Sequence, residues 1–206
     1  MKKLIENVKI EKIDKDLFGL IMTLFHYFFY FKNIRKYDNY EVLLTCTFLA
    51  MKIKNRNIKL DYLIEVFKKI NDNKKLQTET IVKLEINIMA CMGFNFEVNT
   101  PFSPAITYLD IFQKNTLLSE KYINNLNEIK DLMFNIIENC YRRPLCLHFR
   151  PKVIALSSLY YVLVNFKDKE ELAFTYKDLL LINPEVDLES VSSCLNQILN
   201  ILEYNI

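Results

Sequence analysis

A cysteine–histidine cluster offers the most obvious candidate chemistry in this sequence. Cys140, Cys146 and His148 lie close together, and thiolates and imidazoles can bind zinc or act as nucleophile and base. A zinc site needs four ligands at set spacings, yet the chain has two histidines and its five cysteines form no Cys-x-x-Cys pair. We therefore expect no metal, no cofactor and no Cys–His nucleophile. Buried free thiols in a reducing compartment are the simpler interpretation.

Other kinds of catalytic site are disfavoured by the near absence of glycine. The only glycines are Gly19 and Gly93, whereas phosphate-binding loops, βαβ nucleotide folds and hairpin-rich β-proteins need residues with positive φ. No pair of carboxylates has a convergent catalytic pattern either. Apolar residues make up 51% of the chain, so a substantial core can form. The composition therefore favours an all-helical globular protein.

Two polar residues at the edges of apolar stretches are candidates for contact with a partner. Lys52 follows the apolar run 42–51, and Glu85 lies between Leu84 and Ile86. A lysine at the end of a helix usually complements the helix dipole, and a glutamate in the middle of a helix is usually solvated. On residue type alone, both interpretations remain open for both residues.

Hydrophobic periodicity indicates that helices position all of these residues. Thr78 is expected to cap one helix, and Gly93 is expected to end it. Two prolines in the segment Asn95–Pro104 favour an extended linker there. The helices are expected at about 3–12, 15–31, 40–54, 59–71, 79–92, 104–114, 119–141, 151–166, 175–182 and 187–203.

The second half of the chain repeats the plan of the first. The expected helices 40–54 and 151–166 are apolar nearly all round, which is typical of a central helix wrapped by others. The run that begins Glu41-Val-Leu-Leu-Thr-Cys aligns with the run that begins Lys152-Val-Ile-Ala-Leu-Ser, at an offset of 111 residues. The sequence therefore predicts an all-α fold of two tandem five-helix domains, 1–98 and 99–206.

Charge and hydropathy narrow the classes of partner. The net charge is +2, far from the strongly basic footprint of a nucleic-acid-binding protein. Residues 1–100 carry 17 basic and 12 acidic side chains, and residues 101–206 carry 10 and 13, so an acidic partner is drawn to the first half. The most apolar run, Leu17–Phe31, has 15 residues, and a bilayer needs roughly 18–20. We expect no membrane, nucleic-acid or small-molecule partner.

Several motifs, in their order and spacing, resemble the cyclins. Cys46-Thr-Phe-Leu-Ala-Met-Lys52-Ile is similar to the C-x-x-L-A-x-K-I/V segment of that family. The stretch from Val82 to Phe96, with Glu85 33 residues after Lys52, is similar to its E-x-x-x-L-x-x-L-G/x-F segment. Arg150-Pro-Lys-Val resembles the start of the second box in transcription-type cyclins. His26-Tyr-Phe-Phe-Tyr30-Phe-Lys32 and Ile64-Glu-Val-Phe67 look most like cyclin L, with cyclins K, T, C and H as neighbours.

This resemblance implies two cyclin boxes and a function without catalysis. A cyclin binds the C-helix of a cyclin-dependent kinase and holds it inward, so that the kinase completes its own Lys–Glu ion pair. It further implies a nuclear protein acting in RNA polymerase II transcription or pre-mRNA processing. The alternatives are a general-transcription-factor-like cyclin fold that binds DNA and polymerase, or a cell-cycle cyclin. The kinase-binding residues that the resemblance implies are Lys52, Ile53, Glu85, Met89, Phe94 and Phe96.

The sequence also departs from the family pattern in ways that bear on function. Many cyclins follow the lysine with an acidic pair, whereas Lys54-Asn55-Arg56 is basic here, so electrostatic selection of the kinase is expected to differ. Leu163 is the residue of the second repeat that aligns with Lys52. A lysine at this position, as the kinase-contacting residue, is therefore expected in the first box alone. Aligned on Leu17–Phe31, the family's first box helix, with its substrate-docking patch, is expected to begin before Met1.

Overall fold

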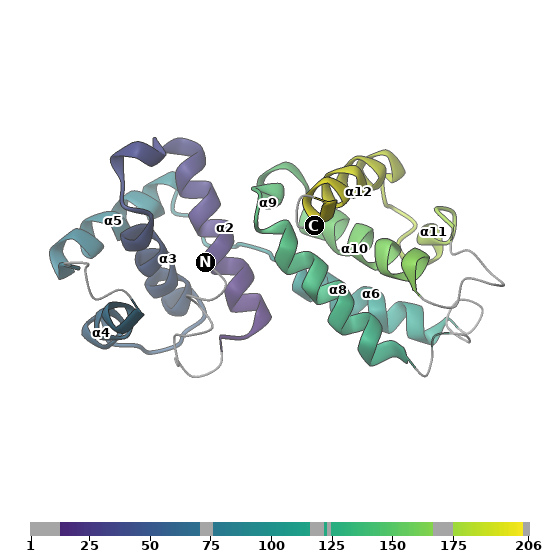
Figure 1. The fold of residues 1–206 in the computed structure, drawn as a ribbon, viewed down its shortest axis with the longest axis horizontal. Coiled ribbons are helices and arrows are strands. Elements are labelled where there is room, and N and C mark those ends of the chain that lie inside the picture. The colour runs from purple at the N-terminus through teal and green to yellow at the C-terminus, as the bar shows by residue number, and fades with distance from the viewer. Residues whose placement is uncertain (1–12, 71–75, 116–121, 123–124, 167–174, 204–206) are drawn as a thin grey trace. The chain divides into compact units, whose positions relative to one another are not determined.

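The computed structural model describes residues 13–70, 76–115, 122, 125–166 and 175–203 (Figure 1). The chain divides into two compact units, Met1–Val98 and Asn99–Ile206. Every regular element among the described residues is a helix, and these residues form no strand. The predicted all-α class is therefore confirmed. The helix expected at 3–12 lies outside the described residues.

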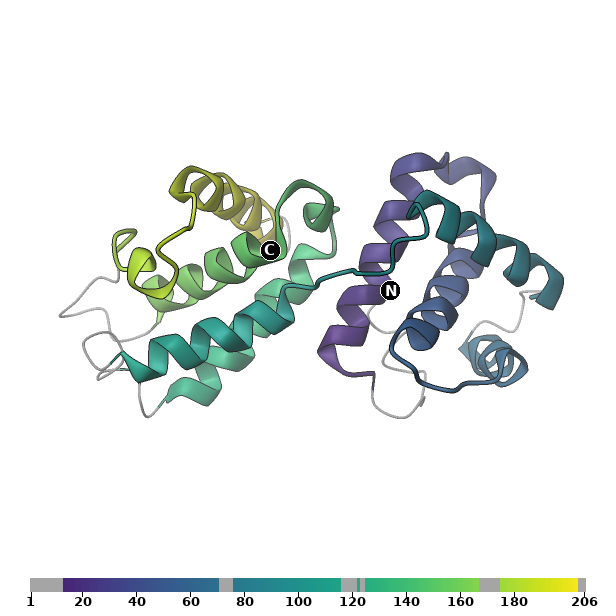
Figure 2. The same cartoon turned by 180° about the vertical axis from the view of Figure 1, so that it is seen from behind.

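The unit Met1–Val98 is organised around one buried helix. Its described α-helices are α2 (Lys15–Phe31), α3 (Asn39–Ile53), α4 (Leu60–Ile70) and α5 (Thr78–Cys91), and a 3₁₀ turn, η1 (Ile34–Lys36), follows α2. Helix α3 is buried without interruption over residues 42–51 and packs against α2, α4 and α5 (Figure 2). The all-round apolar sequence of this segment is thus explained by neighbours on several sides.

Side-chain caps set where the first two of these helices begin. The Asp14 carboxylate accepts a hydrogen bond from the Leu17 backbone N–H at 2.8 Å, and Asp38 accepts from the N–H groups of Tyr40 and Glu41 at 2.8 and 3.2 Å. Both satisfy donors that have no partner inside the helix. The expected Thr78 cap is wrong, because Thr78 is already helical and its predecessor provides no side-chain cap.

The unit Asn99–Ile206 has the same organisation, with α10 at its centre. Helix α10 packs against α6, α8 and α12, and its Leu163 is buried. Two buried serines are tolerated in α10 because their hydroxyls donate to backbone carbonyls, Ser158 to Ile154 at 2.8 Å and Ser157 to Val191 at 3.4 Å. The described α-helices are α6 (Phe102–Lys114), α8 (Leu126–Cys140), α9 (Leu145–His148), α10 (Pro151–Asn165), α11 (Leu179–Ile182) and α12 (Leu188–Glu203).

Three expectations for this unit need correction. Helix α6 begins at Phe102, so the expected extended linker to Pro104 is too long; a proline is tolerated in the first turn, where its missing N–H has no helical acceptor. The expected helix 175–182 is helical only over α11, because residues 176–178 form a turn. The short helix α9 was not expected from the sequence.

No helix among the described residues combines the length and apolar character needed to cross a bilayer. The most apolar one, α2, instead buries most of its first three turns within its own unit.

Candidate functional site

Lys52 and Glu85, which the sequence treats as separate candidates, form an ion pair. Lys52 lies in the last turn of α3 and Glu85 in the middle of α5, and Lys52 Nζ is 2.7 Å from Glu85 Oε1. The two helices pack against each other, which brings together residues 33 positions apart. The lysine side chain is 50% exposed and the glutamate 10%. The Lys52 ammonium therefore lies at the surface, while the Glu85 carboxylate that it contacts is almost buried in the unit.

The pair keeps polar capacity for a partner. The Lys52 ammonium also lies over the Phe48 ring, 4.2 Å from the ring centroid, which fixes its position by a cation–π contact. An ammonium has three donors, and one of them points to Glu85. Among the described residues, no group donates to the second carboxylate oxygen, Glu85 Oε2. The arrangement can thus both donate to carbonyls and accept one N–H.

An apolar strip on α5 borders this pair. Val82 and Ile86 are 43% and 54% exposed, one turn apart, and the half-buried Met89 continues the same line. Isolated exposed apolar residues are ordinary, but a contiguous group beside an ion pair is typical of an interaction surface. Val82 and Ile86 were missed in the sequence analysis. The signal in the sequence is their i, i+4, i+7 spacing with Met89. This apolar line is shifted by one position from the line of core residues Ile81 and Ile88, and therefore predicts a second apolar face.

The turn after α5 holds Phe94 outward. Gly93 and Phe94 have φ values of 60° and 58°, and the Phe94 N–H donates to the Met89 carbonyl at 3.0 Å. The expectation that Gly93 ends the helix is correct. Phenylalanine rarely adopts the left-handed region, and Phe94 is 62% exposed. Ile53 and Phe96, the other expected site residues, are both half-buried.

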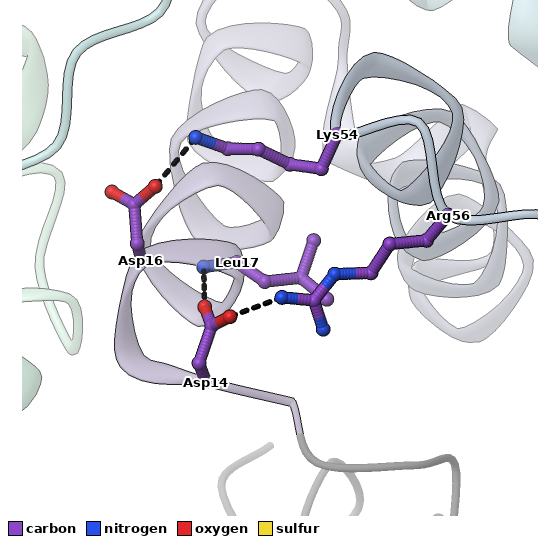
Figure 3. A network of polar contacts seen from close by, with 5 residues as sticks. All are labelled: Asp14, Asp16, Leu17, Lys54 and Arg56. Carbon is purple, nitrogen blue, oxygen red and sulfur yellow. Dashed lines mark hydrogen bonds and ion pairs between the residues drawn. The ribbon is translucent and has the colours of Figure 1, made fainter.

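The basic residues after Lys52 are paired within their own unit. Lys54 Nζ contacts the Asp16 carboxylate, and Arg56 contacts Asp14, the cap of α2 (Figure 3). The positive charge that the sequence places beside the candidate site is therefore matched by two carboxylates at the start of α2. The expected difference in electrostatic selection of the kinase stays a prediction.

The cysteine–histidine cluster shows no arrangement for catalysis or metal binding in the described part of the chain. Cys140 is buried, and burial raises the pKa of its thiol, so the thiol stays protonated at neutral pH. Cys146 is half-buried, and His148 is exposed with Nδ1 2.9 Å from the Pro144 carbonyl oxygen. Among the described residues, no group of three or more potential metal ligands occurs.

Known proteins resemble the chain in sequence. No protein-family model matches it. It is 29% identical over 140 residues to putative cyclin-H of Dictyostelium discoideum, 35% over 120 residues to cyclin-T1.1 of Caenorhabditis elegans, and 24% over 162 residues to cyclin-C1-1 of Oryza sativa subsp. japonica. These matches cover 64%, 53% and 77% of this chain, but only 45%, 25% and 58% of the relatives. The chain thus spans less than two thirds of each.

The fold also has a solved counterpart. A chain in the cryo-EM structure of the yeast TFIIK (Kin28/Ccl1/Tfb3) complex matches with a TM-score of 0.71, covering 97% of this chain and 81% of that one. At 18% identity, this likeness shows the fold alone. The resemblance to cyclin L in particular stays a prediction, since the relatives named above are cyclins H, T and C. In sequence the chain is thus similar to cyclins of the transcription type, and in fold to a chain of the TFIIK complex.

Proposed function

We propose that this chain is a regulatory subunit that binds and activates a cyclin-dependent kinase through the unit Met1–Val98. The observation that carries the proposal is the Lys52–Glu85 pair at 2.7 Å, with the exposed apolar side chains of Val82 and Ile86 on the same helix as Glu85 and exposed Phe94 in the turn that follows that helix. In the isolated unit, Val82 and Ile86 leave apolar surface exposed to water, and the Lys52 ammonium has donors that Glu85 does not use. A protein partner that covers them accounts for both features.

The geometry suits a kinase helix as the partner. Carbonyl groups at the end of a helix lack internal donors, and the Lys52 ammonium, held by Phe48 and Glu85, is positioned to donate to them. The apolar strip then packs against the apolar side of the same helix. Following the family, a C-helix held in this way stays inward, and the kinase rather than this chain carries out phosphoryl transfer.

The process in which this kinase acts is proposed from the relatives. They are cyclins named H, T and C, and the structural counterpart belongs to a TFIIK complex, which supports a nuclear role in RNA polymerase II transcription. A role in pre-mRNA processing has only the motif resemblance to cyclin L behind it.

The decisive experiment is affinity capture from nuclear extract, followed by identification and activity assay of any captured kinase. The key variant exchanges the two charges, Lys52→Glu with Glu85→Lys, because it keeps the internal ion pair but presents the wrong charges to the partner. We expect it to fold but to lose kinase association by about 1–3 kcal/mol for each contact removed. Lys83→Glu, on the same helix and exposed, is the matched control.

Two results would contradict the proposal. Full kinase association by the exchanged variant would exclude the pair as the binding site. Capture of duplex DNA with a steep salt dependence, and of no kinase, would favour the general-transcription-factor alternative instead.

A further inference from the structure

A cleft of about 640 Å³ lies within the unit Asn99–Ile206, where α6 meets the first turn of α10 and the end of α11. Ser103, Thr107 and Tyr108 of α6 line one wall, and Arg150 and Lys152 at the start of α10 line another. The volume is typical of ligand-binding pockets. None of its lining belongs to the unit that carries the proposed kinase site, so the two sites can be tested separately.

The charges around the cleft favour an anion. Arg150 and Lys152 are both exposed, and no acidic residue occurs among the described residues that line the cleft. Three exposed acidic residues lie next to the lining in sequence: Asp110 is adjacent to Ile111, and Glu97 and Glu185 each lie two positions outside the lining. The lining itself therefore carries the two positive charges of Arg150 and Lys152 and no carboxylate, which leaves net positive charge in a concave site.

A buried hydroxyl adds a directed donor. Tyr108 is only 5% exposed, and its oxygen accepts a hydrogen bond from Asn183 Nδ2 at 3.0 Å. Asn183 Oδ1 in turn accepts from the Glu185 N–H at 3.2 Å, which fixes the orientation of the amide. Among the described residues, no acceptor takes the phenolic proton. Burial raises the pKa of Tyr108, so at neutral pH the phenol keeps this proton and can donate it to a ligand.

We propose that this cleft binds the phosphate monoester of a phosphorylated serine or threonine in an extended peptide segment. Such a group presents three acceptor oxygens and close to two negative charges. Arg150 matches it with a planar, two-pronged donor, Lys152 with a point charge. Tyr108 and Ser103 supply neutral donors from α6.

The shape of the cleft favours a peptide over a nucleotide or free phosphate. Ser103, Thr107 and Ile111 follow one another at successive turns, so this wall extends about 12 Å along α6, the length of about four extended residues. Pro104 and Ile111 offer apolar contacts beside the polar end. A nucleotide base needs an aromatic face for stacking, and Tyr108, the aromatic residue of the lining, is buried.

The test measures binding of fluorescein-labelled seven-residue peptide pools to the full chain by fluorescence anisotropy. One pool has a fixed central phosphoserine, and the other has serine at the same place. We expect the phosphorylated pool to bind at least ten-fold more tightly. Lys152→Glu should weaken that binding at least ten-fold, and Tyr108→Phe three- to ten-fold. Lys130→Glu, another exposed helical lysine with the same charge change, should change it less than two-fold.

Each contrary result overturns a stated part of the proposal. Equal affinity of the two pools would exclude phosphate recognition, and equal losses in Lys152→Glu and Lys130→Glu would exclude this cleft. Competition by inorganic phosphate or ATP at the same concentrations as the peptide would show that the ligand is a small anion. Circular dichroism of each variant checks folding, and Lys52→Ala should leave peptide binding unchanged, which separates this site from the kinase site.

Discussion

Gly93 gives the sharpest test of how the backbone shapes the candidate kinase surface. Its φ is 60°, and a Cβ added there would meet no atom within 4 Å. The effect of a substitution therefore comes from the backbone conformation and not from crowding. An L-residue in the left-handed region costs about 1–2 kcal/mol, while replacing glycine removes freedom from the unfolded chain and returns about 0.4–1 kcal/mol. The expected net loss for Gly93→Ala is about 1 kcal/mol.

A series of substitutions at Gly93 separates strain from steric overlap. Asparagine tolerates positive φ better than alanine, and a β-branched residue tolerates it least. We expect stability to decrease in the order glycine, asparagine, alanine, valine, although asparagine is larger than alanine. If crowding decided the outcome, asparagine would be worse than alanine, and that order would refute the reasoning.

The assay should report on each unit of the chain separately. Amide hydrogen exchange followed by mass spectrometry gives the opening free energy of peptides from α3 and α5, which lie in the unit of Gly93. Peptides from α10 in the other unit serve as an internal control and should not change. A uniform loss of protection across both units would mean that the substitution acts globally, contrary to the local argument.

Two further predictions concern stability. Asp14→Ala removes both the α2 cap and the contact with Arg56, and should lower the free energy of unfolding, measured by urea titration, by about 1.5 kcal/mol. Asp14→Asn keeps the cap and should lower it by less than about 1 kcal/mol. Equal losses in the two variants would contradict the double role of Asp14. Burial raises the pKa of the Cys46 thiol, so the folded state keeps a proton that the unfolded state releases above about pH 8.5. Cys46 therefore contributes a loss of stability of about 2 kcal/mol between pH 8 and pH 10, and Cys46→Ala should make the total fall over this range smaller by that amount.

Local signals were sufficient for much of the fold. Helix α2 occupies the predicted residues, and Gly93 ends α5 as expected, because both depend on nearby residues alone. Thr78 was misjudged as a cap because a threonine can begin a helix as well as precede it. Pro104 predicts extended chain before it, but the structure places it in the first turn of α6, where the missing N–H has no helical acceptor.

The candidate site depends on packing between distant segments, which local patterns do not contain. Nothing in either motif indicates that Lys52 and Glu85 meet, since only the contact of α3 with α5 brings them together. Val82 and Ile86 have the residue types of a core, and only the structure shows that the face of α5 that carries them is exposed. The kinase-binding role of Lys52, Ile53, Glu85, Met89, Phe94 and Phe96 remains a prediction.

The uneven burial of the thiols provides reporters for both units. Cys46, Cys140 and Cys194 are buried, whereas Cys91 and Cys146 are partly exposed, one in each unit. Cys91 is the last residue of α5, two positions before Gly93 and close in sequence to Met89 and Phe94. With Cys146 replaced by serine, an environment-sensitive dye on Cys91 would therefore sense docking of the proposed kinase partner on the first unit; with Cys91 replaced instead, the same dye on Cys146 would report on the second unit.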